Sequence, residues 1–209
     1  MDHASEQTEG DTLSVEPAAE SARRTRPKPG ERRLQILQTL AEMLQRPDTE
    51  RVTTAALAAR LDVSEAALYR HFASKAQMFE GLIDFIEQSV FGLVQQITDR
   101  EPLPQAQVRL ILAMVLQFAE KNPGMARVMA GDALVQENER LQARMNLLFD
   151  KLEAALKLRL REAQCPEAPA LASVLTAFVA GRLQRYTRSG FKRLPTEQMQ
   201  DCLALLLPA

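Results

Sequence analysis

The segment RVTTAALAARLDVSEAALYRHF, residues 51–72, constrains the fold more than any other part of this chain. Thr53 or Thr54 can cap the N-terminus of a short helix. That helix would bury Leu57, Ala58 and Leu61. The letters LDVS predict a sharp turn, after which Ser64 can cap a second brief helix over about 65–72. Two short helices that are joined by a few residues and cross at small alanines form a helix-turn-helix.

The second of these helices has a polar side that suits an anionic partner. Its inward positions are Ala67, Leu68 and Phe72, and its outward positions are Ala66, Tyr69, Arg70 and His71. The Tyr69 hydroxyl can meet a phosphate, and the Arg70 guanidinium can meet a phosphate or a guanine edge. The start of the preceding helix aims hydroxyls and amides at the same backbone, and Ser74 caps the next helix. We therefore expect DNA contacts from Thr53, Thr54, Ser64, Ala66, Tyr69, Arg70, His71 and Lys75.

Two alternatives to a DNA interface stay open at this stage. The segment can be an ordinary α-hairpin with surface charges, in which His71 has a structural role. A helical hydrolase or transferase is remote, because the chain has no plausible nucleophile–base pair, phosphate loop, dinucleotide fingerprint or Gly-x-Ser-x-Gly elbow. With two histidines and no metal-site spacing of its two cysteines, we expect no catalytic residue, no metal and no cofactor.

Charge is segregated along the chain, although the formal net charge is only −1. Residues 1–22 carry six acidic residues and no Lys or Arg, whereas residues 23–75 are net basic. A local basic block indicates an anionic partner, although a solvated surface explains a charge run equally well. Residues 1–30 hold almost no large apolar side chain, so we expect an acidic-then-basic disordered tail there. Its last part can be a phosphate-binding arm or a linker.

Hydrophobic periodicity predicts an all-α chain with no strand. From Glu31 to Pro47, a helix is marked by Leu34, Leu37, Leu40, Ala41 and Leu44. A long helix from Lys75 to about Ile97 has a core stripe of Phe79, Leu82, Ile83, Ile86, Val90, Leu93 and Ile97. Further helices are expected over about Pro104–Lys121, where most residues would be buried, over 133–164, and within 167–191 and 196–207.

The compartment can also be predicted. No stretch reaches about 18 uninterrupted apolar residues, so no membrane span is expected. The acidic N-terminus has no apolar core of a signal peptide. Cys165 and Cys202 are expected to be reduced thiols in a cytoplasmic protein, with Cys202 a small core residue.

The segment TTAALAARLDVSEAALYRHFASKAQMF resembles the DNA-binding domain of the TetR superfamily over about residues 31–80. The family ends its recognition helix with Tyr-x-x-Phe followed by Ser-Lys, matched here by Tyr69, Phe72, Ser74 and Lys75. The resemblance implies a three-helix headpiece over 31–76 and a helical dimerisation and partner-binding core over 77–209. It also implies a homodimer whose recognition helices enter successive major grooves of a palindromic site, with one or several dimers on each site.

The strings RLILAMVLQFAEKNPGMARVMAGDAL, ENERLQARMNLLFDKLEAAL and RSGFKRLPTE resemble a narrower group of the superfamily, the nucleoid occlusion factors. The resemblance runs from about residue 32 to the C-terminus and implies association with the nucleoid. It also implies that the DNA-bound form engages the C-terminal tail of the division GTPase FtsZ. The implied partner groove would use Phe85, Ser89, Leu93, Met114, Gln117, Lys121 and Asn122.

Three of these groove residues depart from the group, which usually has a basic residue at Leu93, Gly at Gln117 and Arg at Lys121. Two others have plainer interpretations. Phe85 lies outside the core stripe, on the side of Met78, and can be buried against a neighbouring helix. Asn122, ahead of Pro123, can simply cap the next helix.

The same resemblance implies a four-helix dimer interface from the last two helices. Its residues would be Ala172, Ala177, Ala180, Gly181, Leu203, Leu206 and Leu207. The alternative function within the superfamily is a ligand-responsive repressor, which needs a roomy apolar pocket. The sequence favours no small-molecule ligand, because the core helices are dense in Leu, Ala and Val.

Overall fold

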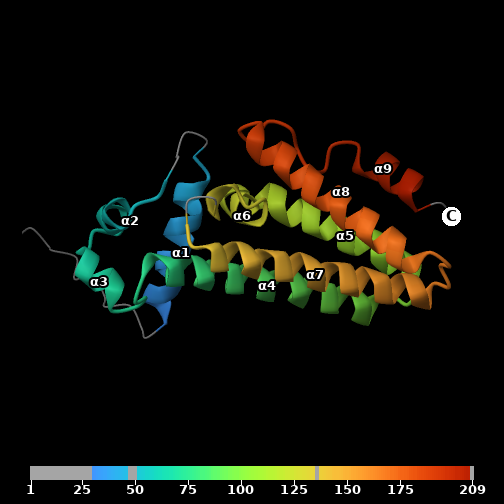
Figure 1. The fold of residues 1–209 in the computed structure, drawn as a ribbon, viewed down its shortest axis with the longest axis horizontal. Helices are drawn as coiled ribbons and strands as arrows, with labels where there is room; N and C mark the ends of the chain where they lie inside the picture. The colour runs from blue at the N-terminus through green and yellow to red at the C-terminus, as the bar shows by residue number, and fades with distance from the viewer. Residues whose placement is uncertain (1–29, 47–50, 135–136, 208–209) are drawn as a thin grey trace, which may run out of the picture.

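The computed structural model describes residues 30–46, 51–134 and 137–207, and these residues contain no β-strand. The predicted all-α class is therefore confirmed. In chain order the elements are α1 Glu31–Leu44, α2 Thr54–Leu61, α3 Glu65–Tyr69, α4 Lys75–Arg100, α5 Pro104–Lys121, α6 Pro123–Met129, the 3-10 turn η1 Asp132–Leu134, α7 Glu139–Glu162, α8 Ala168–Arg188 and α9 Met199–Leu206. Helices α1 to α3 gather at one end of an elongated bundle, and α4, α5, α7 and α8 run along its length (Figure 1). Apart from Gly30, the predicted tail lies outside the described residues, as does Pro47.

We call α1, α2 and α3 the headpiece, and side-chain caps define where α2, α3 and the following helix α4 begin. The capping hydroxyls accept bonds from backbone amides: Thr53 from Ala56 at 3.1 Å, Ser64 from Ala67 at 3.2 Å and Ser74 from Gln77 at 3.2 Å. Of the two threonines considered for the first cap, the structure selects Thr53. Helix α3 ends at Tyr69, earlier than predicted, because the amides of His71 and Phe72 both bond to the Leu68 carbonyl and tighten the chain.

The core stripe of α4 departs from the predicted one near the end of the helix. As predicted, the buried residues include Phe79, Leu82, Ile83, Ile86 and Val90. After Val90 the buried position is Val94, whereas Leu93 and Ile97 are only half-buried. A straight helix drifts by about 20° per seven residues from a strict seven-residue repeat, which moves the stripe to the next residue. Helix α4 also continues past Ile97 to Arg100.

The headpiece is joined to the bundle by polar contacts as well as by packing. Helix α6 packs on α1, and Arg127 of α6 donates to the carbonyl oxygens of Leu44 at 3.4 Å and Arg46 at 3.1 Å. These carbonyls lie at the C-terminal end of α1, where no intrahelical donor is left. Glu137, in the connection before α7, accepts a bond at 2.5 Å from Lys75 Nζ at the start of α4, and its Oε1 also lies 4.0 Å from Nε of Arg51, between α1 and α2. The headpiece therefore has fixed contacts with the bundle.

The helix predicted over residues 133–164 is wrong at its start. The structure has the turn η1 and then a helix that begins at Glu139. Asn138 sets this start, because its side chain accepts a bond from the Arg140 amide at 2.9 Å. The remainder of the prediction, a long charged helix, corresponds to α7.

The apolar residues that α8 and α9 expose differ from those predicted for the dimer interface. Ala172, Leu203 and Leu207 are buried within the chain itself, so they are not free to meet a second copy. The exposed apolar side chains on these two helices include Val174 at 52% and Leu205 at 84%. Cys202 is half-buried and does not belong to the core cluster, contrary to the prediction; its Sγ accepts a bond from Arg182 Nη2 at 3.1 Å. Over the described ranges, no helix combines the length and the apolar character needed to cross a membrane.

Candidate nucleic-acid interface and partner groove

In α3 and the three residues that follow it, the inward and outward positions agree with the sequence prediction. Leu68 and Phe72 are each 1% exposed and Ala67 is half-buried. The outward residues Ala66, Tyr69, Arg70 and His71 are all exposed. Tyr69 keeps 45% of its surface exposed, so its hydroxyl is accessible to a partner. The predicted DNA-contact role of these residues stays a prediction, but their orientation is compatible with it.

The remaining predicted DNA-contact residues have partners within the chain. The hydroxyls of Thr53 and Ser64 are helix caps. Thr54 Oγ1 donates to Glu65 Oε2 at 2.6 Å, which ties the N-terminus of α2 to that of α3. The Lys75 ammonium is paired with Glu137 and its side chain is only 19% exposed. A direct phosphate contact by Lys75 would compete with this ion pair.

Sequence reasoning missed one residue of this region, Arg33 in α1. Its Nη1 donates to the carbonyl oxygen of His71 at 2.9 Å, just beyond the end of α3. Its guanidinium carbon also lies 4.0 Å from the centroid of the Phe72 ring. The two partners are far from Arg33 in sequence, so the basic run that contains it indicated charge but not this contact.

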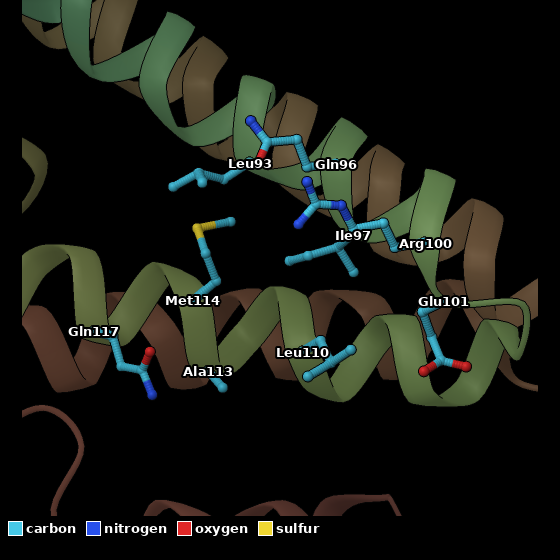
Figure 2. Close-up of a pocket in the computed structure, with 9 residues that line it drawn as sticks. All are labelled: Leu93, Gln96, Ile97, Arg100, Glu101, Leu110, Ala113, Met114 and Gln117. Carbon is cyan, nitrogen blue, oxygen red and sulfur yellow. The ribbon is translucent and has the colours of Figure 1, made fainter.

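A surface groove of about 420 Å³ lies between α4 and α5. It is lined by Leu93, Gln96, Ile97, Arg100, Glu101, Leu110, Ala113, Met114 and Gln117. Leu93 and Ile97 point from α4 toward Met114 of α5, and Arg100 lies further along the same helix (Figure 2). Leu110 is 45% exposed, so α5 is less buried than the sequence predicts. The groove is thus apolar at its centre and charged at the end that carries Arg100 and Glu101.

The structure brings together three of the seven predicted groove residues, namely Leu93, Met114 and Gln117. Six lining residues were missed as groove residues: Gln96, Ile97, Arg100, Glu101, Leu110 and Ala113. Their spacing of three or four residues carried a signal, because it places them on the same helix faces as the three predicted ones. Which apolar face would be left uncovered depends on how α4 and α5 diverge, and the sequence pattern does not contain that angle.

The other predicted groove residues lie beyond this lining, toward the headpiece. Phe85 is 36% exposed, and Ser89 Oγ donates to its carbonyl at 2.8 Å. The plainer interpretation, in which Phe85 is buried against a neighbouring helix, is wrong, although Met78 on the same side of α4 is 0% exposed. Helix α1 packs on α4, where Leu37 lies close to Gly81. Lys121 is exposed at the end of α5.

Asn122 lies between α5 and α6, and the structure separates its two predicted roles. It occupies the N-cap position of α6, with Pro123 in the first turn. Its side chain makes no N-cap bond there. Instead Nδ2 donates to the Phe118 carbonyl at 2.7 Å, so the side-chain amide provides a hydrogen-bond donor for a carbonyl in the last turn of α5. The second N–H of Nδ2 and the Oδ1 atom are not used in this bond.

The fold and the headpiece define a helix-turn-helix regulator of the TetR type. Residues 36–82 match the family model described as bacterial regulatory proteins, tetR family, and residues 104–208 match the SlmA-like model of a tetracyclin repressor-like C-terminal domain. The fatty acid degradation regulator FadR from Bacillus halodurans has a TM-score of 0.70 at 16% identity, over 88% of this chain and 98% of that one. FadR from Bacillus subtilis, solved with stearoyl-CoA, has a TM-score of 0.66 at 12% identity, over 84% and 97%. At these identities the likeness concerns the fold.

Relatives of higher sequence identity indicate which group of TetR-type regulators this chain resembles. Nucleoid occlusion factor SlmA from Vibrio cholerae is 48% identical over 183 residues, which cover 84% of this chain and 93% of that protein. SlmA from Shewanella amazonensis is 49% identical over 177 residues, 81% and 90% of the two chains. SlmA from Alteromonas mediterranea is 48% identical, over 81% and 91%. The chain belongs to the SlmA family of nucleoid occlusion factors, which are TetR-type regulators.

Proposed function

We propose that this chain is a DNA-bound inhibitor of cell division. A homodimer binds palindromic duplex sites on the chromosome through α3, and its α4–α5 groove engages the C-terminal tail of FtsZ. Septum assembly is thereby blocked over the nucleoid. The protein would act in the cytoplasm, in association with the nucleoid. Family membership supports the proposal, since the relatives are named nucleoid occlusion factors.

The main support for the proposal is that one continuous helix, α4, connects the DNA-facing headpiece to the groove. Helix α4 begins at Lys75, directly after the headpiece, and reaches the groove at Leu93 and beyond. The exposed apolar centre suits the side chains of a short peptide, and Arg100 can attract its acidic groups. DNA bound at one end and a peptide at the other would then be held by the same rigid element.

The proposed dimer would form through the exposed side of α8 and α9. Val174, Ala177 and Leu205 are exposed on these helices. A Cβ atom on Gly181 would meet no other atom within 4 Å, which leaves space for a second helix. Small residues at a crossing allow close approach, and leucines supply the apolar area that a stable interface needs.

Purified protein mixed with FtsZ and GTP would test the proposal by light scattering, with and without a duplex that carries a palindrome bound by the protein. We expect the polymer signal to fall only when that duplex is present. A duplex of scrambled sequence is the control. Tight DNA binding without any effect on FtsZ would contradict the proposal and favour the ligand-responsive repressor.

A further inference from the structure

We propose that Arg33 is a positioning residue for the recognition helix, an inference that rests on the proposed DNA-binding function. It does not read DNA itself. Its guanidinium bridges the His71 carbonyl, at 2.9 Å, and the face of the Phe72 ring, at 4.0 Å from the centroid. His71 and Phe72 lie two and three residues beyond the last residue of α3, so Arg33 fixes the turn by which the chain leaves the DNA-facing surface.

The recognition helix depends on such contacts because it is very short. It has five residues, of which only Leu68 is buried. A helix of this length is not stable by itself in water. Its last carbonyl groups have no intrahelical donors, and a cation near a helix C-terminus is favourable. Arg33 brings a positive charge close to this end, and it donates to the carbonyl of His71, two residues beyond the last residue of α3.

The two ends of α3 are held from different helices. At the N-terminal end, Thr54 of α2 donates to Glu65 at 2.6 Å. At the C-terminal end, Phe72 is 1% exposed and packs so close to Gly81 of α4 that its ring would lie 3.1 Å from a Cβ there. Arg33 adds a contact from α1. Without this contact, the exposed side chains of Tyr69 and Arg70 would keep their hydrogen-bonding groups, but their orientation would be less firmly fixed.

The test compares Arg33→Gln with Arg32→Gln in the full chain. Arg32 is a matched control: it is the neighbouring arginine, and its Nη1 donates within α1, to Gln35 Oε1 at 2.8 Å. The probes are the duplex most enriched by wild-type protein from a randomised pool and an unrelated duplex of equal length. Fluorescence anisotropy gives the affinity for each over about 50–200 mM salt, where phosphate contacts show as a slope.

We expect Arg33→Gln to weaken binding of the enriched duplex roughly fivefold more than Arg32→Gln does, the effect of losing one hydrogen bond that orders α3. The unrelated duplex should be affected equally by both variants. The salt slopes of the two variants should also agree. Arg33→Lys should recover part of the loss, because it restores one donor and the charge.

Three results would overturn the proposal. If Arg33 contacts a phosphate directly, both duplexes weaken alike and the slope falls by about one relative to Arg32→Gln. If Arg33 only supports the fold, the melting temperature of Arg33→Gln drops and binding recovers on cooling. Equal affinities for the two variants would remove any special role. A wild-type protein that enriches no duplex would instead refute the proposed function.

Discussion

Gly124 of α6 lies directly against the main chain of Ala41 in α1. A Cβ atom on Gly124 would be 1.9 Å from the Ala41 carbonyl oxygen and 2.8 Å from its carbonyl carbon. No side chain rotation can relieve such a clash, because the atoms it meets belong to the backbone. This contact sets how closely the headpiece approaches the bundle, since α1 belongs to one and α6 to the other.

Replacing Gly124 with Ala should therefore force α1 and α6 apart. We expect Gly124→Ala to lower the free energy of unfolding by about 1–3 kcal/mol, the usual cost of overpacking. Gly92→Ala is the control, because a Cβ on Gly92 in α4 meets nothing within 4 Å. That change should raise stability by up to about 1 kcal/mol through helix propensity. Urea unfolding at equal protein concentration measures both, and equal effects would contradict the predicted clash.

The Tyr69 hydroxyl should contribute to DNA binding without contributing to stability. Tyr69 is 45% exposed, so Tyr69→Phe leaves the packing of the headpiece intact. We expect severalfold weaker binding of the enriched duplex, as for one lost phosphate hydrogen bond, and an unchanged melting temperature. Thr53→Ala should also weaken binding, but it removes the cap of α2 and should cost about 1 kcal/mol of stability. Unchanged anisotropy for Tyr69→Phe would argue against the contact.

The groove should engage FtsZ through its exposed leucine. We expect Leu110→Ser to reduce co-sedimentation with FtsZ in the presence of DNA, because the variant removes apolar surface from the α5 wall. Leu147→Ser is the matched control: Leu147 is 53% exposed on α7, compared with 45% for Leu110, and it does not line the groove. DNA affinity should not change in either variant. A loss of FtsZ binding in both, or in neither, would exclude a specific role of the groove.

Phe85 tests how far the bound peptide extends from the groove toward the headpiece. The side chain is 36% exposed on α4, two helical turns before Leu93. We expect Phe85→Ala to weaken FtsZ engagement and to spare DNA binding, since truncation of an aromatic anchor removes much of its contact area. Co-sedimentation equal to that of wild type would confine the peptide to the lining between Leu93 and Arg100.

Alkaline pH should destabilise the protein through Tyr186. Burial, with a smaller effect of the Glu120 charge, raises the pKa of Tyr186 above 10.0. The folded state thus favours the neutral phenol, whose hydroxyl donates to the Glu120 carbonyl at 3.2 Å. The associated stability is fully present below pH about 10 and is lost as pH rises through the folded-state pKa.

Tyr186→Phe removes this titration. At neutral pH, Tyr186→Phe should lower the free energy of unfolding by about 1 kcal/mol, because one hydrogen bond is lost. Its urea midpoint should therefore be slightly lower than that of wild type. The two midpoints should then converge above pH about 10. Parallel curves over the alkaline range would contradict the predicted shift.

Much of the fold could be predicted from local sequence. The capping residues Ser64 and Ser74, the inward position of Leu68 and the limits of α5 all agree with the structure. Each depends on residues a few positions apart, because a cap bonds to the next turn and helix periodicity repeats every 3.6 residues. The predicted end of α3 was wrong because the turn that ends the helix does not change the spacing of the apolar residues. Periodicity therefore could not indicate it.

The contacts on which the candidate sites depend were decided only by the tertiary structure. Arg33 meets His71 across 38 positions, and Lys75 meets Glu137 across 62. The groove exists because α4 and α5 leave Leu93 and Met114 uncovered. The position of Gly124 has no room for a side chain because α6 there reaches the backbone of α1. Such contacts depend on the angles and distances between packed helices. Those quantities result from the packing of the whole core, so local sequence determined the helices and the tertiary structure determined which of their side chains meet.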